Sequence, residues 1–481
     1  MYKNDASGRV AARTYLNDQD LLGMVAQAGG ETIPTADPYT GEVIAEIPST
    51  KPSRIAEVVS TSRATLESWR SSLIEERVAL LRRMADLIDD SYDELAAIES
   101  IDVGKLYAGT RGWDVGNARD VLRFYADHGP EYLERSEEYE RGRSFRQPLG
   151  AIAALSPWNA PLAVGTWKVA PALLAGCTVV LKAPERAPLS TLALTRLAEQ
   201  ADAPSGAVQV VAGLGSEVGT ALVEASGLDG ISFTGGTSVA SSIIAASAEN
   251  LPRMVLELGG KNANVVFADA DLDEAVAGTV TAIFDVAGQN CCAGSRTIVE
   301  SSIREEFIER LVAATGEIVV GDQFDEATTM APQIDSRHAA TVLQAIEKAQ
   351  QEGAKLLCGG SVRGPNETCL EPTLIVPLSL DQEIWNEEIF GPVGCIAEFD
   401  GIEEAIEMAN ATEYGLSASV WSSDPAKLER FAAESEVGVC WTNTFGLFDI
   451  GVPWGGVKRS GYGRELALST LDEFTRVKTV Y

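Results

Sequence analysis

Short apolar runs rich in β-branched residues alternate with helical patterns along the first half of the chain. Four such runs span residues 151–155, 178–181, 208–211 and 230–233, and helical patterns follow at 189–199 and 239–248. Continuous apolar strands are buried on both faces and are joined by crossover helices. The alternation therefore predicts an α/β fold built on a parallel, doubly wound sheet. Helical spacing of apolar residues over 75–100 predicts a helix before that sheet.

The same pattern restarts in the second half of the chain. Residues 264–267 and 296–299 are typical of strands, and residues 272–286 and 303–315 are typical of helices. With 481 residues, the chain is also too long for one simple core. We therefore expect a second α/β unit from about residue 260.

Two further segments do not fit either unit. Residues 131–146 are charged and poor in core residues, so we expect this segment to project from the body. The tail, residues 474–481, alternates in the manner of a strand. If the two segments pair, they can extend the sheet of a neighbouring copy, which predicts a homo-oligomer, either a homodimer or a homotetramer.

Composition excludes several classes of function. The net charge of −32 repels phosphate backbones and anionic membranes, so we expect no nucleic-acid or membrane partner. The most apolar stretch, residues 151–183, is interrupted by prolines and Lys168, and the N-terminus lacks the apolar core of a secretory signal. The seven cysteines never form a Cys-x-x-Cys pair, which disfavours disulfides and a metal site. A cytoplasmic location is the simplest expectation.

A cysteine and a glutamate supply both halves of a covalent mechanism. Cys291 is a soft nucleophile, and Glu257 lies in an apolar, glycine-rich segment where an unpaired charge is costly. Because the chain has only two histidines, the simplest base for a catalytic cysteine is a carboxylate. Spacing alone does not choose between Cys291 and its neighbour Cys292.

Two glycine strings are candidates for a phosphate-binding turn. Residues 213–219 follow a predicted strand, but Val218 stands where a dinucleotide fingerprint has its third glycine. Gly235 and Gly236 follow the next strand and lead into a helix. A helix N-terminus offers free N–H groups and the positive end of a dipole, so we favour the second string.

Seven motifs, taken together and in order, resemble the NAD(P)-dependent aldehyde dehydrogenases of the non-acylating, hydrolytic type. They cover nearly the whole chain, and they are residues 156–162 (SPWNAPL), 182–185 (KAPE), 233–236 (FTGG), 256–261 (LELGGK), 288–296 (GQNCCAGSR), 387–392 (EEIFGP) and 453–458 (PWGGVK). The resemblance implies an NAD-dependent oxidoreductase that converts a small aldehyde to a carboxylic acid.

The resemblance also implies three parts. A Rossmann-like, NAD-binding domain is expected at residues 1–129 and 149–259, and a catalytic domain at residues 260–459. A small β oligomerisation element is expected at residues 130–148 and 460–481. Both of the larger domains are expected to be doubly wound α/β units.

Catalytic roles follow from the same motifs. The resemblance selects Cys291 as the nucleophile that forms a thiohemiacetal and then a thioester. Asn159 is expected to donate to the developing oxyanion, and Glu257 to activate the water that hydrolyses the thioester. Lys168 and Glu465 match positions linked to proton relay.

Cofactor residues are also assigned by resemblance. Lys182 and Glu185 match a pair that binds the adenosine ribose, and a carboxylate there repels a 2′-phosphate, which favours NAD over NADP. Gly236 stands where many family members have serine, which leaves the backbone to contact the pyrophosphate. The full set of expected cofactor residues is Trp158, Lys182, Glu185, Gly235, Gly236, Leu258, Glu388 and Phe390.

The expected substrate pocket is apolar and aromatic. The positions that resemble the substrate funnel are Ala160, Val164, Trp167, Asp285, Asn290, Phe445, Phe448 and Trp454. Such walls suit an apolar or aromatic aldehyde. Asp285 could instead attract a cationic substrate such as betaine aldehyde, with cation–π support from the rings. No arginine is present among these positions to bind the carboxylate of a semialdehyde acid.

Two rival functions stay open at this stage. A CoA-acylating dehydrogenase would use CoA in place of water, but Glu257 argues against it, because that reaction needs no water-activating base. A non-catalytic homologue on the same fold is disfavoured by the joint presence of Cys291, Glu257, Asn159 and Glu388.

Overall fold

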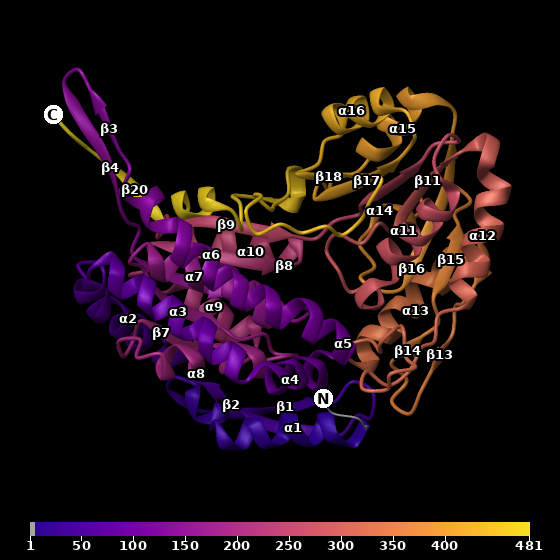
Figure 1. Ribbon diagram of the computed structural model, residues 1–481. Helices are drawn as coiled ribbons and strands as arrows, with labels where there is room; N and C mark the ends of the chain where they lie inside the picture. The colour runs from indigo at the N-terminus through magenta and orange to yellow at the C-terminus, as the bar shows by residue number, and fades with distance from the viewer. Residues whose placement is uncertain (1–4) are drawn as a thin grey trace.

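The computed structural model describes residues 5–481 and has the predicted α/β fold. Two large sheets, one of six and one of seven strands, form separate layers with helices on both faces (Figure 1). A three-stranded sheet projects from the body. No helix in residues 5–481 is both long enough and apolar enough to span a membrane.

The six-stranded sheet carries the first half of the predicted pattern. Its order is β19-β9-β8-β5-β6-β7, and all pairs are parallel except β19 with β9. The strands are β5 (Ala151–Leu155), β6 (Thr178–Lys182), β7 (Val208–Val211), β8 (Gly230–Gly235), β9 (Arg253–Leu258) and β19 (Gly461–Tyr462). The four predicted runs are therefore strands. The two residues of β19 lie within the range 460–481 that was expected to belong to the oligomerisation element.

The centre of this sheet is buried on both faces, which explains why β5 is continuously apolar. On β5, Ile152 and Ala154 pack on one face and Ala153 and Leu155 on the other. The first face is covered by α3 (Ile74–Asp90), α4 (Tyr92–Val103), α6 (Val115–Glu134), α7 (Pro161–Leu174) and α8 (Leu189–Gln200). The second is covered by α2 (Ile55–Trp69), α9 (Thr220–Glu224) and α10 (Thr237–Ser247).

The seven-stranded sheet repeats this arrangement in the second half. Its order is β12-β15-β16-β11-β10-β17-β18, with only β12 antiparallel to its neighbour. The strands are β10 (Ala263–Val266), β11 (Arg296–Glu300), β12 (Lys355–Cys358), β15 (Thr373–Val376), β16 (Val393–Phe399), β17 (Ser417–Trp421) and β18 (Val439–Thr442). One face packs on α11 (Leu272–Phe284) and α12 (Arg304–Gly316), and the other on α13 (Ser336–Gln351), α15 (Gly401–Asn410) and α16 (Pro425–Glu434).

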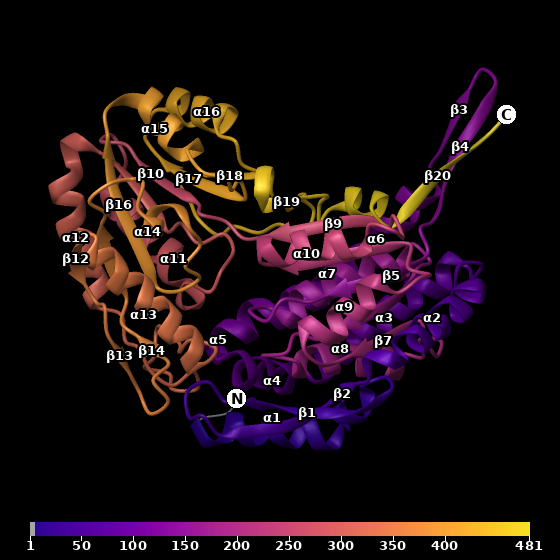
Figure 2. The ribbon, with the colours of Figure 1, turned by 180° about the vertical axis from the view of Figure 1, so that it is seen from behind.

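The projecting sheet joins segments that are far apart in the chain. It consists of β3 (Ser136–Tyr139), β4 (Gly142–Pro148) and β20 (Thr475–Val480), paired antiparallel in the order β20-β4-β3. Figures 1 and 2 both show it extending away from the body beside the C-terminus. The predicted terminal strand and the predicted projection are thus paired with each other.

Two predicted helices differ from the structure. Residues 75–100 form not one helix but two, α3 and α4, which separate at Ser91. The helix expected over 272–286 ends at Phe284. Asp285 is extended, and Val286 and Ala287 have φ angles of 51° and 54°, which a right-handed helix does not accommodate. This reversal of the backbone begins the loop that carries Cys291.

A cluster of buried charges lies at the junction of α4 and α6. The Lys105 ammonium donates to Asp114 at 2.6 Å, and both side chains are buried. Glu99 on α4 is fully buried beside them. Burial, followed by repulsion from Asp114, raises the pKa of Glu99 to about 8. At neutral pH this carboxyl group is therefore mostly protonated.

The cluster gives a prediction for folding stability. Lys105→Met leaves the Asp114 carboxylate buried and unpaired, so we expect a loss of about 3–5 kcal/mol. Glu99→Gln replaces a mostly neutral carboxyl group by an amide of the same shape and should cost much less at pH 7. Thermal and urea unfolding of both variants checks this, and equal losses would show that Glu99 is ionised in the fold.

The same cluster predicts a dependence on pH. The pKa of Glu99 in the fold, about 8, lies above its ordinary value of 4.5, so the folded state binds the extra proton. The stability that Glu99 contributes is complete below pH 4.5 and is lost as the pH rises from 4.5 through about 8. Glu99→Gln should lack that part of the slope.

Candidate active site

One cavity of about 730 Å³ gathers residues from both halves of the chain. Eighteen of the twenty-one predicted site residues line it. These are Trp158, Asn159, Ala160, Val164, Trp167, Lys182, Glu185, Gly235, Gly236, Glu257, Leu258, Asn290, Cys291, Glu388, Phe390, Phe448, Trp454 and Glu465. Lys168, Asp285 and Phe445 lie outside its lining.

Strand ends bring the first-half residues to this cavity. Asn159 follows β5, Lys182 ends β6, Gly235 ends β8, and Glu257 lies near the end of β9. In open parallel sheets the carboxyl ends of the strands meet at one edge, where ligands bind. The residues predicted from separate motifs therefore converge because the strands are parallel.

The loop that carries Cys291 is fixed by the side chain of Asn262. Its amide nitrogen donates to the carbonyl oxygens of Cys291 at 2.8 Å and Ala293 at 3.0 Å. Its amide oxygen accepts from the backbone N–H of Ser417 at 3.0 Å. One buried amide thus joins the loop to β17, and it sets the position of the Cys291 backbone.

The two adjacent cysteines differ in environment. Cys291 is half-buried and lines the cavity, whereas Cys292 is fully buried. The Cys292 thiol donates to the Asn290 side-chain oxygen at 3.1 Å. Its hydrogen bond with Cys291 and its burial raise the pKa of Cys292 well above the ordinary value. Since the thiolate is the nucleophilic form, the structure favours Cys291 over Cys292.

Asn159 is held beside the same loop. Its side-chain N–H₂ group donates one proton to the carbonyl oxygen of Gln289 at 2.9 Å. An amide N–H₂ group carries two protons, so one donor remains for a ligand. Asn159 and Cys291 both line the cavity. A fixed donor beside a nucleophile is the arrangement that stabilises a developing oxyanion.

Glu257 is a buried carboxylate without a hydrogen-bond partner among residues 5–481. Only 4% of it is exposed. Burial and repulsion from Glu465 raise its pKa well above the ordinary value, although Lys168 acts in the opposite direction. A carboxyl group whose pKa is raised in this way is suited to accept a proton near neutral pH.

Lys168 connects this region to the C-terminal segment. Its fully buried ammonium donates to Glu465 at 2.5 Å, to Thr234 at 2.8 Å and to Ser232 at 3.1 Å. All three of its protons are thus directed to oxygen atoms. Although Lys168 is outside the cavity lining, its partner Glu465 is part of that lining.

Glu185 and Lys182 lie at another part of the cavity, next to the first glycine string. The backbone N–H of Gly215 donates to the Glu185 carboxylate at 2.9 Å. Burial lowers the pKa of Lys182 to about 8, while Glu185 opposes that shift. Gly215 itself lines the cavity, so the glycine string that the sequence argument set aside also contributes to it.

Gly235 and Gly236 lead into α10 as predicted. Gly236 is the N-cap of α10, and a Cβ atom built there has nothing within 4 Å. The space in front of this helix end is therefore open. Free N–H groups at a helix N-terminus bind phosphate oxygens, so the geometry fits a pyrophosphate group.

Glu388 is packed against two glycines of the LELGGK motif. The backbone N–H of Gly260 donates to Glu388 at 3.1 Å, and a Cβ atom at Gly259 would lie only 2.0 Å from its carboxylate. Burial raises the pKa of Glu388 to about 7, and the Gly260 N–H and Lys261 partly oppose that rise. A side chain at position 259 would therefore displace the Glu388 carboxylate from the place it now occupies.

Aromatic rings line the rest of the cavity. Phe448 and Trp454 have ring centroids 4.6 Å apart, and Trp167 lies 6.5 Å from Phe448. Of the other predicted substrate residues, Phe445 packs against Trp441 behind this wall, with centroids 5.0 Å apart. Asp285 is exposed at the end of α11.

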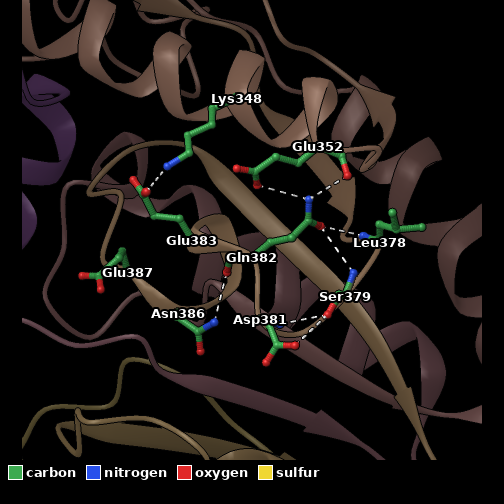
Figure 3. A pocket seen from close by; sticks show the side chains of 9 residues that line it. All are labelled: Lys348, Glu352, Leu378, Ser379, Asp381, Gln382, Glu383, Asn386 and Glu387. Carbon is green, nitrogen blue, oxygen red and sulfur yellow. Dashed lines mark hydrogen bonds and ion pairs between the residues drawn. The ribbon is translucent and has the colours of Figure 1, made fainter.

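A second hollow, shown in Figure 3, is a poorer candidate. Its lining is mainly polar, and the polar groups bond to one another. Lys348 pairs with Glu383, and the Gln382 side chain bonds to Glu352 and to the backbone of Leu378. A ligand would have to break these contacts, and the lining contains neither a cysteine nor a histidine.

Comparison with known proteins identifies the family of this chain. The sequence pattern of the family described as "Aldehyde dehydrogenase family" matches residues 24–480. The chain belongs to the aldehyde dehydrogenase family.

Individual relatives cover nearly the whole chain. An aldehyde dehydrogenase of Enchytraeus buchholzi is 39% identical over 95% of this chain and 93% of its own length. The betaine aldehyde dehydrogenase of Bacillus subtilis is 38% identical over 92% and 93%. The structure of the indole-3-acetaldehyde dehydrogenase of P. syringae, in complex with NAD⁺ and IAA, superposes with a TM-score of 0.92 at 34% identity, covering 95% and 94%.

Some residues of this aldehyde dehydrogenase were missed by sequence reasoning. Trp113, Arg186 and His338 also line the cavity. His338 forms a 2.8 Å hydrogen bond with the carbonyl oxygen of Phe390, and its ring contacts Trp158 edge-on. His338 lies in none of the seven motifs, and its partner Phe390 is distant in sequence, so the sequence did not mark it as a site residue. Only the fold brings these residues together.

The difference between the cysteines gives a prediction about alkylation. We expect iodoacetamide to modify Cys291 first. Burial shields Cys177, Cys292, Cys369 and Cys395, and it raises the pKa of the half-buried Cys358 and Cys440. Peptide mapping after brief labelling measures this, with Cys291→Ala as the control. Faster labelling of any other cysteine would contradict the assignment of Cys291 as the reactive thiol.

Proposed function

We propose that this enzyme oxidises an apolar or aromatic aldehyde to the carboxylic acid with NAD as its cofactor. The observation that carries the proposal is that Cys291, Asn159, Glu257 and Glu388 line one cavity. A nucleophile, an oxyanion donor, a base and a cofactor-binding carboxylate are the groups that this reaction needs. Family membership supports the reaction class, and the roles of the residues are our inference.

The first step is addition of the Cys291 thiolate to the aldehyde carbon. The C–S bond forms as the C=O π pair moves to oxygen, which gives a thiohemiacetal with a negative oxygen. The remaining N–H of Asn159 and the backbone N–H of Cys291 are available to that oxygen. A preorganised donor of this kind is typically worth about 10²–10³ in rate. The hydride would then leave the thiohemiacetal carbon as the C=O bond re-forms, so that a thioester remains on Cys291; NAD⁺, when bound, would supply the hydride acceptor.

Glu257 completes the reaction. Its carboxylate accepts a proton from water, whose oxygen adds to the thioester carbon and releases the acid and the Cys291 thiolate. The raised pKa of Glu257 suits this base role, because a stronger base removes the proton more readily. Lys168 and Glu465 are hydrogen-bonded beside it, and we assign them to the removal of that proton.

The residues of the cofactor region fit a dinucleotide. The open N-terminus of α10 at Gly236 suits a pyrophosphate, and Glu388 offers its carboxylate to ribose hydroxyls. Glu185 is held at the cavity by Gly215. A fixed carboxylate accepts hydrogen bonds from a 2′-hydroxyl and repels a 2′-phosphate, so we propose NAD over NADP.

The cavity wall supports the choice of aldehyde. Trp167, Phe448 and Trp454 are aromatic, and Ala160 and Val164 are small or apolar. The P. syringae relative is named for indole-3-acetaldehyde, which is an aromatic aldehyde. The cationic alternative relies on Asp285, which is outside the cavity lining. The rings can still hold a cation, and the B. subtilis relative is named for betaine aldehyde.

The assembly and location are proposals as well. We propose the division into an NAD-binding domain (1–129 and 149–259), a catalytic domain (260–459) and an oligomerisation element (130–148 and 460–481). The outer strands β3 and β20 leave unpaired edges, and Tyr139, Val477 and Val480 are exposed on them. Pairing of these edges with another copy gives a homodimer or a homotetramer, and a cytoplasmic enzyme fits the reduced cysteines.

The substrate is tested by NADH formation at 340 nm. We expect turnover with NAD⁺ to be strongest on benzaldehyde and medium aliphatic aldehydes, weaker on betaine aldehyde and weakest on semialdehyde acids. Each aldehyde is measured with and without CoA, and with NADP⁺ in place of NAD⁺. Activity that appears only with CoA would overturn the hydrolytic mechanism. Activity only on betaine aldehyde would overturn the substrate class, and no activity at all would favour a non-catalytic homologue.

The role of Glu257 is tested by Glu257→Gln. The variant keeps the shape of the side chain but cannot accept the proton, so a burst of NADH of about one equivalent per site should precede a stall. We expect the steady rate to fall by about 10²–10⁴-fold. In the parent enzyme the steady rate should increase with pH as Glu257 ionises, and the variant should lack that increase. An unchanged steady rate would place the base elsewhere.

A further inference from the structure

Three aromatic rings from three different elements meet at the cavity. We name Trp113, Trp167 and Phe448 the three-ring cluster. Their centroids are 6.2 Å apart for Trp113–Trp167, 5.7 Å for Trp113–Phe448 and 6.5 Å for Trp167–Phe448. All three rings line the cavity together with Asn290 and Cys291. At these separations the rings touch one another, so together they form a continuous piece of wall.

Trp113 is held in the cluster by its own segment. It lies in a π-helical turn, Thr110–Asp114, directly before α6. Its neighbour Asp114 forms the buried ion pair with Lys105, and the Lys105 ammonium lies 5.5 Å from the centroid of the Trp113 ring. Short π-helical turns are often found at functional sites. The Trp113 ring therefore lies next to the ammonium of this buried ion pair.

The partners of Trp113 are also fixed. The indole N–H of Trp167 donates to the side-chain oxygen of Asn117 at 2.5 Å. Phe448 packs against Trp454 at 4.6 Å between centroids, and Trp441 lies behind both rings at 6.2 and 6.1 Å. A wall made of rings that cannot easily turn has a definite shape, and so it can discriminate among substrates by size.

We propose that Trp113 is a specificity-determining residue, whose ring closes the three-ring cluster and selects compact, ring-bearing aldehydes over long or bulky ones. The proposal rests on the function proposed above, since it concerns the wall beside Cys291. The plane of the Trp113 ring makes an angle of 75° with that of Trp167 and 65° with that of Phe448, so both contacts are edge-to-face. A flat aromatic aldehyde can make the same edge-to-face contact with the wall, whereas a flexible alkyl chain has no ring with which to make it.

Two substitutions separate the shape of the ring from its presence. Trp113→Phe keeps an aromatic ring of smaller size, and Trp113→Leu removes the ring. For Trp113→Leu we expect kcat/KM for benzaldehyde to fall about tenfold, the effect of losing one aromatic contact. The values for 2-naphthaldehyde and octanal should rise, because the wall is opened. Trp113→Phe should lie between the parent and Trp113→Leu, and the KM for NAD⁺ should stay unchanged.

Trp441→Phe is the matched control. Trp441 packs against Phe448 and Trp454 but does not line the cavity. Its substitution should therefore leave the ratio of kcat/KM for benzaldehyde to kcat/KM for octanal unchanged. Melting temperatures of all variants show whether the fold is retained. An equal loss on every aldehyde in the Trp113 variants, or a parent-like ratio in Trp113→Leu, would overturn the proposal.

A product-binding measurement keeps the two proposals distinguishable. Inhibition constants of benzoate and octanoate are measured against whichever aldehyde the parent oxidises. If benzoate binding weakens about tenfold in Trp113→Leu and octanoate binding does not, Trp113 selects rings even where the parent prefers betaine aldehyde. If neither inhibition constant changes, Trp113 does not contribute to the selection of the substrate, whatever the panel of aldehydes shows.

Discussion

The buried ion pair between Lys168 and Glu465 is the contact on which the interior of the site depends. Glu257 and Glu465 are both buried near each other, and their repulsion contributes to the raised pKa of Glu257. Lys168 is the cation that α7 places among them, and its protons are all directed to oxygen atoms. A buried carboxylate without such a cation would be too costly to keep ionised. The pair also ties the C-terminal segment to the first sheet, because Glu465 follows β19.

Close approach of backbone to carboxylate is the second requirement of the site. Gly455 has a φ angle of 151°, and a Cβ atom there would lie 2.6 Å from the Glu257 carboxylate. Gly259 stands in the same relation to Glu388. Both glycines fall within motifs that the sequence identified, and the structure gives the physical reason. A side chain at either position would displace a functional carboxylate from its present place.

Much of the fold and the site follows from local sequence, and the failures have physical causes. A strand such as β5 was predicted because burial on both faces demands an unbroken apolar run, and parallel pairing then brings the strand ends together. The end of α11 was missed, because Val286 and Ala287 adopt left-handed angles that neither residue type favours. Trp113 was missed because nothing in its own segment marks it, and its importance comes from rings more than fifty residues away.

The three-ring cluster also links the two halves of the molecule. Trp113 and Trp167 belong to helices that cover the first sheet, whereas Phe448 follows β18 of the second sheet. The edge-on contact of Trp113 with Phe448 therefore depends on how the two sheets are placed, and Cys291 belongs to the second half as well. A shift between the halves would move the nucleophile and Phe448 together against Trp113. The shape of the substrate wall is thus a property of the packing between the two α/β units, which is why no single motif encodes it.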